Sequence, residues 1–262
     1  MKITSNIEFD ENGNQITYVY CDNRVISKQV KKAVPDSEVN MPLKKEHIIN
    51  VGKSVFYLPN YEVDLIQGCI NGNRNYFSLN ELVAAREYLT PDSVVVDAGA
   101  NIGNHTLYFA NECNVKKIYA FEPVPYTFRI LKRNIELNNL QGRVLLRNAG
   151  LSDRIMKGAV GSYDTCNLGG TRITDAFGGK IELVTLDSLQ LTIKIDFLKI
   201  DVEGMDYKML CGAKETILRD MPVIMIESFD EDFKNTDPLL NSFGYEIAKN
   251  LGNAEYLYVP KK

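Results

Sequence analysis

The pattern of apolar and polar positions changes near residue 80 of the chain. Beyond it, short apolar runs bounded by turn-forming residues alternate with stretches whose apolar residues recur at helical spacing. Short continuous apolar runs are typical of parallel strands that are buried on both faces. The runs that predict strands are 93–97, 117–121, 143–147, 195–200 and 222–227, and the stretches that predict helices are 79–89, 125–138 and 205–218. This alternation predicts a doubly wound α/β domain, in which a ligand binds beyond the carboxyl ends of the strands.

The part of the chain before this change has a β-like pattern. Residues 15–20 alternate apolar and polar side chains, and residues 54–58 form a second short run of the same kind. We therefore predict a small, mostly β appendage over residues 1–75 and the α/β domain over residues 76–262.

Residues 152–182 interrupt the strand–helix alternation. They hold six glycines and few apolar anchors, which predicts one long loop. Two interpretations stay open, a loop that covers the substrate and a simple surface insertion. Tyr163 and Asp164, which lie in this stretch, are candidate substrate contacts under the first interpretation.

Composition narrows the class of protein. The 30 basic and 34 acidic residues are interspersed, so we expect no nucleic acid partner and no anionic membrane surface. No apolar run approaches the ~18 residues that a membrane span requires. The N-terminus lacks an apolar signal segment, and the five cysteines form no C-x-x-C pair. We expect a soluble cytoplasmic protein with reduced thiols; the pattern is equally compatible with any oligomeric state.

A glycine-containing turn follows the first predicted strand of the domain. It begins at Asp97, passes through Gly99 and Gly103, and leads into a helix. Dinucleotide-binding turns have the order G-x-G-x-x-G, which is absent here, and Asp97 would repel a pyrophosphate. A carboxylate at this place suits the ammonium group of a methionine-like ligand. These features argue against a nicotinamide-dependent oxidoreductase; the remaining alternative is a purely structural turn.

A second carboxylate, Glu122, ends the next predicted strand. It follows the glycine turn at about the 20-residue spacing at which an acidic side chain binds the ribose hydroxyls of a nucleotide. Alone it is equally compatible with an N-cap of the following helix. Together with the glycine turn, it favours an adenosine-containing ligand.

The motifs of the domain, taken in order, resemble those of the FkbM-type methyltransferases. They are VVVDAGANIGNHTLYFA, IYAFEPVPYTFRILKRNIELN, NAGLSD, TLDSL and FLKIDVEGMDYKMLCGA, and they cover roughly residues 80–230. The resemblance implies a class I methyltransferase fold, a Rossmann-like, mostly parallel sheet of seven strands with one antiparallel strand near its end. It also implies S-adenosylmethionine as the cofactor and O-methylation of a sugar or natural-product hydroxyl.

The resemblance also assigns cofactor contacts. By position, Asp97, Gly99, Asn101 and Gly103 would line the methionine half of the cofactor, and Glu122 its ribose. Asn148 follows the third strand of the domain, where adenine usually lies. Its amide suits either the adenine edge or a local backbone contact.

Candidate catalytic residues follow the fourth and fifth predicted strands. Asp201 and Glu203 can remove the proton of the acceptor hydroxyl, or, together with Glu227, hold a divalent cation that acidifies it. In the alternative, Asp201 contacts the amino acid end of the cofactor and Glu203 caps a helix. His105, just after the glycine turn, is another candidate base, although a helix N-terminus disfavours its charged form. No residue is assigned as a metal ligand.

The sequence therefore predicts an S-adenosylmethionine-dependent O-methyltransferase that acts on a hydroxyl of a carbohydrate, as part of a glycan or a small sugar-containing metabolite. The alternatives are a non-sugar natural product as acceptor and a non-catalytic protein that keeps the fold and binds a partner. The presence of Asp97, both glycines and Glu122 argues against the last of these.

Overall fold

The computed structural model describes residues 3–9, 15–21, 24–31, 43, 46–163, 166–176 and 178–261. A seven-stranded sheet forms the centre of the α/β domain, in the order β15-β16-β14-β13-β6-β7-β8. Its strands are β6 (Val94–Ala98), β7 (Lys117–Phe121), β8 (Val144–Arg147), β13 (Phe197–Ile200), β14 (Val223–Glu227), β15 (Tyr245–Gly252) and β16 (Glu255–Pro260). β16 is antiparallel to both of its neighbours, whereas the other pairings are parallel. The predicted class I methyltransferase fold is confirmed.

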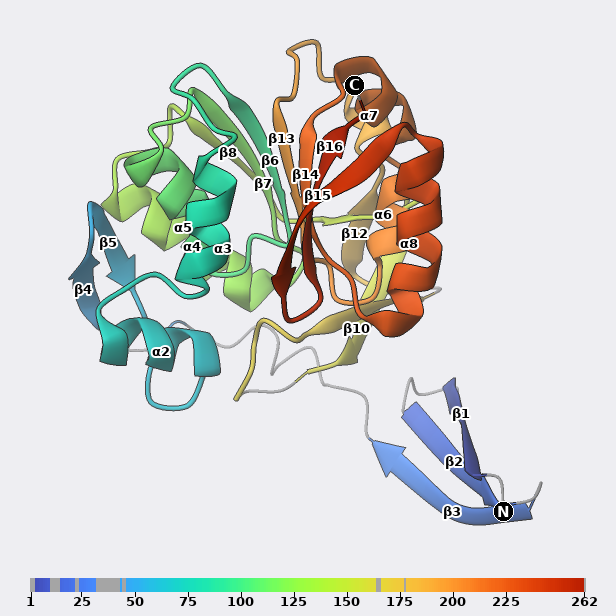
Figure 1. Ribbon diagram of the computed structural model, residues 1–262. Helices are drawn as coiled ribbons and strands as arrows, with labels where there is room; N and C mark the ends of the chain where they lie inside the picture. The colour runs from blue at the N-terminus through green and yellow to red at the C-terminus, as the bar shows by residue number, and fades with distance from the viewer. Residues whose placement is uncertain are drawn as a thin grey trace.

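Helices cover both faces of this sheet, with α3, α4 and α5 on one side and α6, α7 and α8 on the other (Figure 1). Their bounds are α3 (Leu79–Arg86), α4 (Asn104–Leu107), α5 (Pro125–Leu137), α6 (Asp206–Cys211), α7 (Lys214–Asp220) and α8 (Asp230–Ser242), and a π-helical turn, η1 (Tyr108–Glu112), continues α4. Alternate residues of β6 enter different hydrophobic clusters: Val95 packs in one, and Val94 and Val96 pack in the other. Burial on both faces explains why the strands are continuous apolar runs.

The strand order places the ligand-binding edge of the sheet. The chain runs from β6 outward through β7 to β8, and later from β13, on the other side of β6, outward to β14. The connections therefore diverge between β6 and β13, and a crevice forms beyond the carboxyl ends of these two strands. Asp97 of β6 pairs in register with Lys199 of β13 just below this crevice.

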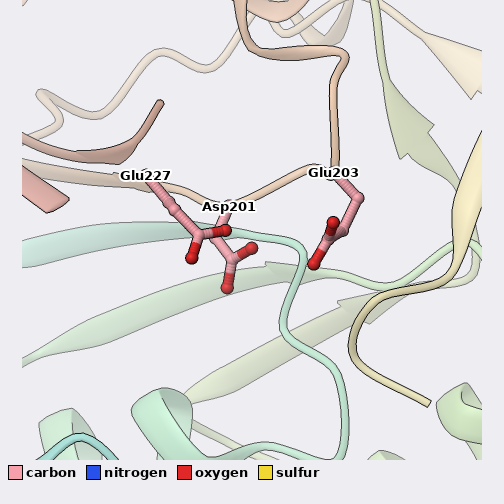
Figure 2. Close-up of side chains that lie close together, drawn as sticks. All are labelled: Asp201, Glu203 and Glu227. Carbon is pink, nitrogen blue, oxygen red and sulfur yellow. The ribbon is translucent and has the colours of Figure 1, made fainter. Parts of the chain in front are cut away.

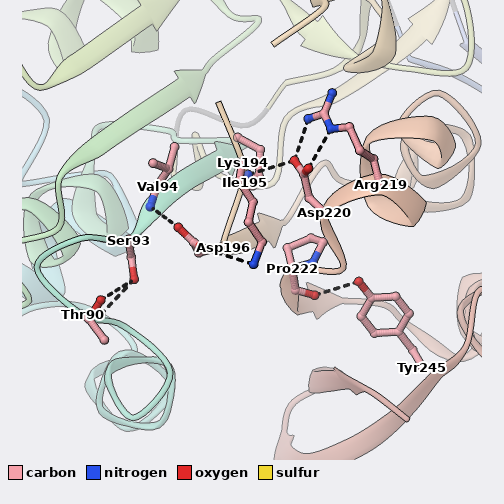
Figure 3. Close-up of polar contacts among 10 residues, drawn as sticks. All are labelled: Thr90, Ser93, Val94, Lys194, Ile195, Asp196, Arg219, Asp220, Pro222 and Tyr245. Carbon is pink, nitrogen blue, oxygen red and sulfur yellow. Dashed lines mark hydrogen bonds and ion pairs between the residues drawn. The ribbon is translucent and has the colours of Figure 1, made fainter. Parts of the chain in front are cut away.

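Polar contacts hold the opposite edge of the sheet together (Figure 3). The backbone N–H of Val94 donates to Asp196 at 2.9 Å, and that of Ile195 donates to Asp220 at 2.9 Å. Asp220 is only 6% exposed and pairs with Arg219. These carboxylates accept bonds from buried backbone groups that would otherwise lack a partner. This edge supports the fold, and the crevice lies at the other end of the strands.

Two predictions about secondary structure were wrong. Residues 205–218 form α6 and α7 and not one helix, because a Cβ at Gly212 would lie 1.9 Å from the carbonyl oxygen of Ser152, and the chain bends where these backbones meet. The side chain of Asp187 then accepts the backbone N–H groups of Glu215 and Thr216 and caps the new helix.

The second wrong prediction is the single long loop over residues 152–182, because much of this glycine-rich stretch forms a sheet. β10 (Met156–Ser162) and β11 (Arg172–Asp175) join β12 (Ile181–Val184) and β9 (Gly150–Leu151) in a four-stranded sheet of order β11-β10-β12-β9. A Cβ at Gly158 would lie 2.9 Å from the Ile173 side chain of the neighbouring strand. Glycine is used here for close packing within a sheet. Asp164 lies outside the described residues, and Tyr163 is buried.

Before the α/β domain, the described residues form two small sheets and a helix. β1 (Ile3–Phe9), β2 (Gln15–Cys21) and β3 (Arg24–Lys31) form an antiparallel sheet, and β4 (Ile48–Val51) pairs with β5 (Ser54–Tyr57). The N–H groups of Tyr57 and Val55 donate to Asn134 at 2.6 Å and to Asn138 at 2.9 Å, which ties β5 to α5. α2 (Leu65–Asn73) follows, with Asp64 as its N-cap. No helix within the described residues is long and apolar enough to cross a membrane.

Candidate active site

The turn after β6 builds the floor of the crevice. The N–H groups of Gly99 and Ala100 both donate to the carbonyl oxygen of Phe121, which bends the chain sharply at the end of the strand. Gly99 and Gly103 have φ angles of +77° and +96°, a region that favours glycine. A Cβ at Gly103 would also lie 2.8 Å from a methyl carbon of Leu131. Both glycines are therefore required by the backbone path, and Gly99 also lines the crevice.

Glu122 lies beside this turn, 5% exposed. One carboxylate oxygen accepts the N–H of Asn101 at 2.9 Å, and the other accepts the N–H of Val124 at 2.8 Å. Burial raises the pKa of Glu122 to about 7, although these two backbone donors oppose the rise. Each carboxylate oxygen can accept a second hydrogen bond, so both remain able to bind hydroxyl groups of a ligand.

A buried ion pair network lies beneath the floor, centred on Lys199, which the sequence analysis did not single out. The Lys199 Nζ atom is 3.4 Å from Asp97 Oδ1 and 3.2 Å from Asp201 Oδ2, and it donates to the carbonyl oxygen of Gly99 at 2.8 Å. Burial lowers the pKa of Lys199, but the Asp201 and Asp97 carboxylates outweigh this effect and raise it overall. A lysine inside the apolar run FLKI was the signal available in the sequence, because lysine is almost never fully buried without a partner.

Asp97 belongs to this network and not to the surface of the crevice. It is fully buried, and its second oxygen accepts the Thr106 hydroxyl at 2.5 Å. Within the described part of the chain it lines neither of the two cavities described below. Its contact with the Lys199 ammonium fixes the β6 and β13 ends relative to each other.

Three carboxylates converge beyond β13 and β14. Oxygen atoms of Asp201, Glu203 and Glu227 lie within 4.8 Å of one another, and Figure 2 shows the Asp201 and Glu227 side chains adjacent with Glu203 beside them. Burial first, and then the Asp201 carboxylate, raise the pKa of Glu203 to about 7 and that of Glu227 to about 9. Three carboxylates supply hard oxygen ligands that can hold a divalent cation, and the same carboxylates can accept a proton.

His105 lies on the first turn of α4, at the far side of the glycine turn. Its Nε2 atom is buried without a hydrogen-bond partner among the described residues. Burial, and then the Lys199 ammonium, lower its pKa to about 3. The imidazole is therefore neutral at pH 7 and is a weak base.

The Asn148 side chain makes a local backbone contact, which is one of the two roles that the sequence left open. Its side-chain amide donates to the carbonyl oxygens of Glu122 and Pro123 at 2.8 and 3.1 Å. It supports the bend that presents the Glu122 carboxylate. In the described chain it lines neither cavity, whereas the adjacent Gly150 lines the larger one.

Two adjacent cavities open at this edge of the sheet. The larger, of about 220 Å³, extends from Glu122 past Gly150 to Glu203. The smaller, of about 190 Å³, contains His105 and Lys199. Gly99, Asn101, Asp201 and Glu227 line both, so ligands in the two cavities would meet along this common wall.

A loop that follows β10 covers the larger cavity. Gly169, Gly170 and their neighbours line it, and whether this loop also contacts the substrate stays a prediction. Asp64 ties this loop to α2: one carboxylate oxygen accepts the N–H of Gln67 at 2.9 Å and the other accepts that of Leu168 at 2.8 Å. The helix cap and the loop over the cavity are thus held by one side chain.

The comparisons with known proteins assign the family. The family model described as the methyltransferase FkbM domain matches residues 97–247. The chain belongs to the FkbM methyltransferase family. This confirms the resemblance carried by the sequence motifs, and FkbM membership makes methyl transfer the chemistry of the domain and S-adenosylmethionine the cofactor that it implies.

Two curated relatives and one solved structure agree with this assignment. Methyltransferase 1 of Beauveria bassiana is 28% identical over 60% of this chain and 74% of its own length. The 31-O-demethyl-FK506 methyltransferase FkbM of Streptomyces tacrolimicus is 35% identical over 29% of this chain and 31% of its own. The crystal structure of methyltransferase FkbM from Methylobacillus flagellatus superimposes with a TM-score of 0.50 at 19% identity over 65% of this chain. The match spans 44% of that structure's chain, and it supports the fold alone.

Proposed function

We propose that this FkbM-family chain transfers the methyl group of S-adenosylmethionine to a hydroxyl oxygen of a carbohydrate, either free or within a glycan or metabolite. The observation that supports oxygen as the acceptor atom is the group of three neighbouring carboxylates, with Asp201 and Glu227 on the common wall of the two cavities and Glu203 in the larger cavity. A hydroxyl must lose its proton to become methylated, and these groups can accept it.

The residues of the larger cavity fit the cofactor. The side-chain oxygen of Asn101 is buried without a hydrogen-bond partner in the described structure, and Asn101 lines both cavities. A buried acceptor of this kind is suited to a donor group of a ligand, such as an ammonium. Glu122 would hold the ribose hydroxyls, while Gly99 and Asn101 would hold the methionine end. Bound there, S-adenosylmethionine supplies an electrophilic methyl group on a sulfonium.

We assign proton removal to Glu203. A carboxyl group with a pKa near 7 is partly ionised at neutral pH and matches the requirement for a general base. In the bound complex, the hydroxyl proton would pass to the Glu203 carboxylate as the carbon–oxygen bond forms and the carbon–sulfur bond of the cofactor breaks. Asp201 is held by Lys199 at 3.2 Å and would orient the acceptor, and the neutral imidazole of His105 would contact it from the smaller cavity.

A divalent cation at the same three carboxylates is the second way to acidify the hydroxyl. The convergence of three oxygen ligands within 4.8 Å favours it, whereas proton sharing among the carboxyls needs no metal. The two arrangements differ in their dependence on a chelator, which the experiment below uses.

A second candidate acceptor is a hydroxyl of a non-sugar natural product. The name of the Streptomyces tacrolimicus relative, a 31-O-demethyl-FK506 methyltransferase, favours it. Both candidates share the same transfer to oxygen, so a screen of acceptors distinguishes them.

The test begins with calorimetric titration of the protein with S-adenosylmethionine, with magnesium and with a chelator. Transfer of a labelled methyl group to a panel of sugars and hydroxylated natural products follows. We expect cofactor binding in both conditions and label in a carbohydrate fraction. Activity that is lost with the chelator and restored by magnesium would assign the three carboxylates to a metal. Absence of cofactor binding by the folded protein would overturn the proposal.

A further inference from the structure

The smaller cavity has an acidic wall, of which the proposed reaction uses only Asp201 and Glu227. Four carboxylates line it, from Glu81 on α3, Asp201 after β13, Glu227 at the end of β14 and Glu255 at the start of β16. Among the described residues that line it, the single lysine, Lys199, is already paired with Asp97 and Asp201. The wall as a whole is therefore able to bind positive charge.

Glu255 is the residue that points to a ligand. It is 6% exposed and lines the smaller cavity, and its carboxylate has no hydrogen bond or ion pair within the described structure. It also lies directly opposite Glu227 in the antiparallel pairing of β14 and β16. Like charges in opposed positions of a sheet repel each other, and a desolvated carboxylate without a partner is costly. A cation in the cavity would relieve both effects.

The cavity is also positioned for the acceptor. It shares Gly99, Asn101, Asp201 and Glu227 with the cofactor cavity, so a molecule bound there would lie against Asp201 and Glu227, whose carboxylate oxygens are within 4.8 Å of the assigned base, Glu203. Asn253, in the turn between β15 and β16, also lines it. An occupant of this cavity would therefore have room to place a hydroxyl at the common wall and a cationic group at Glu255.

We propose that the acceptor carries a protonated amino group, as an amino sugar does, and that Glu255 and Glu81 bind this ammonium while the hydroxyl to be methylated lies at the common wall. This inference rests on the proposed function, since it names the class of acceptor for that site. An ammonium group is also present on the cofactor itself, and the experiment separates these two sources.

The probes are three methyl glycosides with the same ring: methyl 2-amino-2-deoxy-β-D-glucopyranoside, its N-acetyl derivative and methyl β-D-glucopyranoside. Each is titrated calorimetrically into protein saturated with S-adenosylhomocysteine. We expect the amine to bind at least about tenfold more tightly than either uncharged glycoside, the effect of ~1.4 kcal/mol from one partly buried ion pair. Equal affinities, or no binding of the amine, would overturn the inference.

Variants identify the groups responsible. Glu255→Gln and, on a separate element, Glu81→Gln should each remove most of the preference for the amine while keeping the affinity for S-adenosylhomocysteine within about twofold. Glu246→Gln, an exposed acid on β15, is the matched control and should change neither affinity. If Glu255→Gln weakens S-adenosylhomocysteine as much as the amine, the acidic wall holds the amino group of the cofactor.

Proton release on binding of the amine is an independent test of its contact with Glu255. The groups that face Glu255 are Glu81, Asp201, Asp206 and Glu227, with Lys199 and His105 as the basic side chains of this wall. Burial, and then Asp201 and Glu81, raise the pKa of Glu255 to about 8, so binding of an ammonium at pH 7 should release a proton. Titrations in two buffers of different ionisation enthalpy measure the number of protons released, and Glu255→Gln should reduce it.

The outcomes separate this inference from the proposed function. If S-adenosylhomocysteine fails to bind, the proposed function fails. If it binds and the amine shows neither preference nor proton release, only this inference fails.

Discussion

A Cβ atom on Gly99 would lie 1.7 Å from the backbone carbonyl oxygen of Asp201. The turn that supports the cofactor and the strand end that carries the candidate catalytic carboxylates are therefore in backbone contact. No side chain can separate them, so their relative position is set by the main chain.

Gly99→Ala should accordingly damage both fold and binding. The clash is with backbone, which cannot move aside as a flexible side chain would, and the residue has φ of +77°. We expect a loss of ~2–4 kcal/mol in the free energy of unfolding and no measurable affinity for S-adenosylhomocysteine. Gly72→Ala in α2 is the control, because a Cβ there meets nothing within 4 Å and should leave both quantities nearly unchanged. A folded Gly99→Ala protein with normal affinity would contradict the placement of the cofactor.

Methyl transfer should increase with pH through about 7. Glu203 accepts a proton only when ionised, and its raised pKa of about 7 places this change between pH 6 and 8. Glu203→Gln should lower kcat by ~10²–10⁴ and remove this inflection, with unchanged S-adenosylhomocysteine affinity. Glu231→Gln, on the exposed face of α8, should have no effect. A wild-type pH profile in Glu203→Gln would assign the base to another group.

Lys199→Met should be strongly destabilising. It leaves the fully buried Asp97 without its cation, which typically costs ~3–5 kcal/mol when one partner of a buried pair is removed. Urea unfolding measures it. Adding Asp97→Asn to Lys199→Met should recover part of the loss, because the uncompensated charge disappears. Lys208→Met removes an exposed pair with Asp175 and should cost at most ~1 kcal/mol. Equal stability of both single variants would refute a structural role for the buried network.

The ligand-free protein should become less stable as pH rises from about 4.5. The pKa values of Glu122, Glu227 and Glu255 are raised in the fold to between about 7 and about 9, so the folded state binds protons more tightly than the unfolded chain. The stabilisation is complete below the ordinary carboxyl pKa and is lost as pH rises through the raised values. We expect the free energy of unfolding to fall by at least about 2 kcal/mol between pH 5 and pH 9. Glu122→Gln should flatten this dependence, and an unchanged slope would argue against burial as the cause of the shift.

Asp64→Ala should loosen the loop over the larger cavity. The variant removes the acceptor of the Leu168 N–H, so hydrogen exchange at that amide should accelerate and the affinity for S-adenosylhomocysteine should decrease several-fold. Asp187→Ala removes a comparable helix cap from α7, far from the loop, at a similar cost of ~1 kcal/mol. It should leave Leu168 exchange as in the wild type. Equal acceleration in the two variants would mean that global stability, and not the tether, controls the loop.

The sequence predicted the parallel part of the sheet well, because strands buried on both faces form short, mostly apolar runs. Residues 117–121, for example, match β7 in full. The glycine-rich stretch and Gly212 were misinterpreted for one reason: a glycine needed for close packing against a distant backbone looks the same in sequence as a glycine in a loop. Only the fold places Ser152 against Gly212.

The residues of the candidate site also differ in whether a local sequence pattern predicts them. Gly99, Glu122 and Asp201 directly follow recognisable strands, so their convergence followed from the topology. Glu255 begins a strand of the C-terminal hairpin and Glu81 lies within a helix; neither belongs to a local motif. Their approach depends on the antiparallel return of β16, which no local pattern encodes.

The donor and acceptor sides of this site are built from different kinds of structure. Backbone bonds between the glycine turn and the end of β7 define the donor side, where substitutions are poorly tolerated. The acceptor side depends more on α3 and the turn between β15 and β16, which line the smaller cavity and where side chains can vary without disturbing the sheet. Divergence of a gene for this fold can therefore change which molecule is methylated while the source of the methyl group stays constant, and engineering of acceptor choice should start from these two segments.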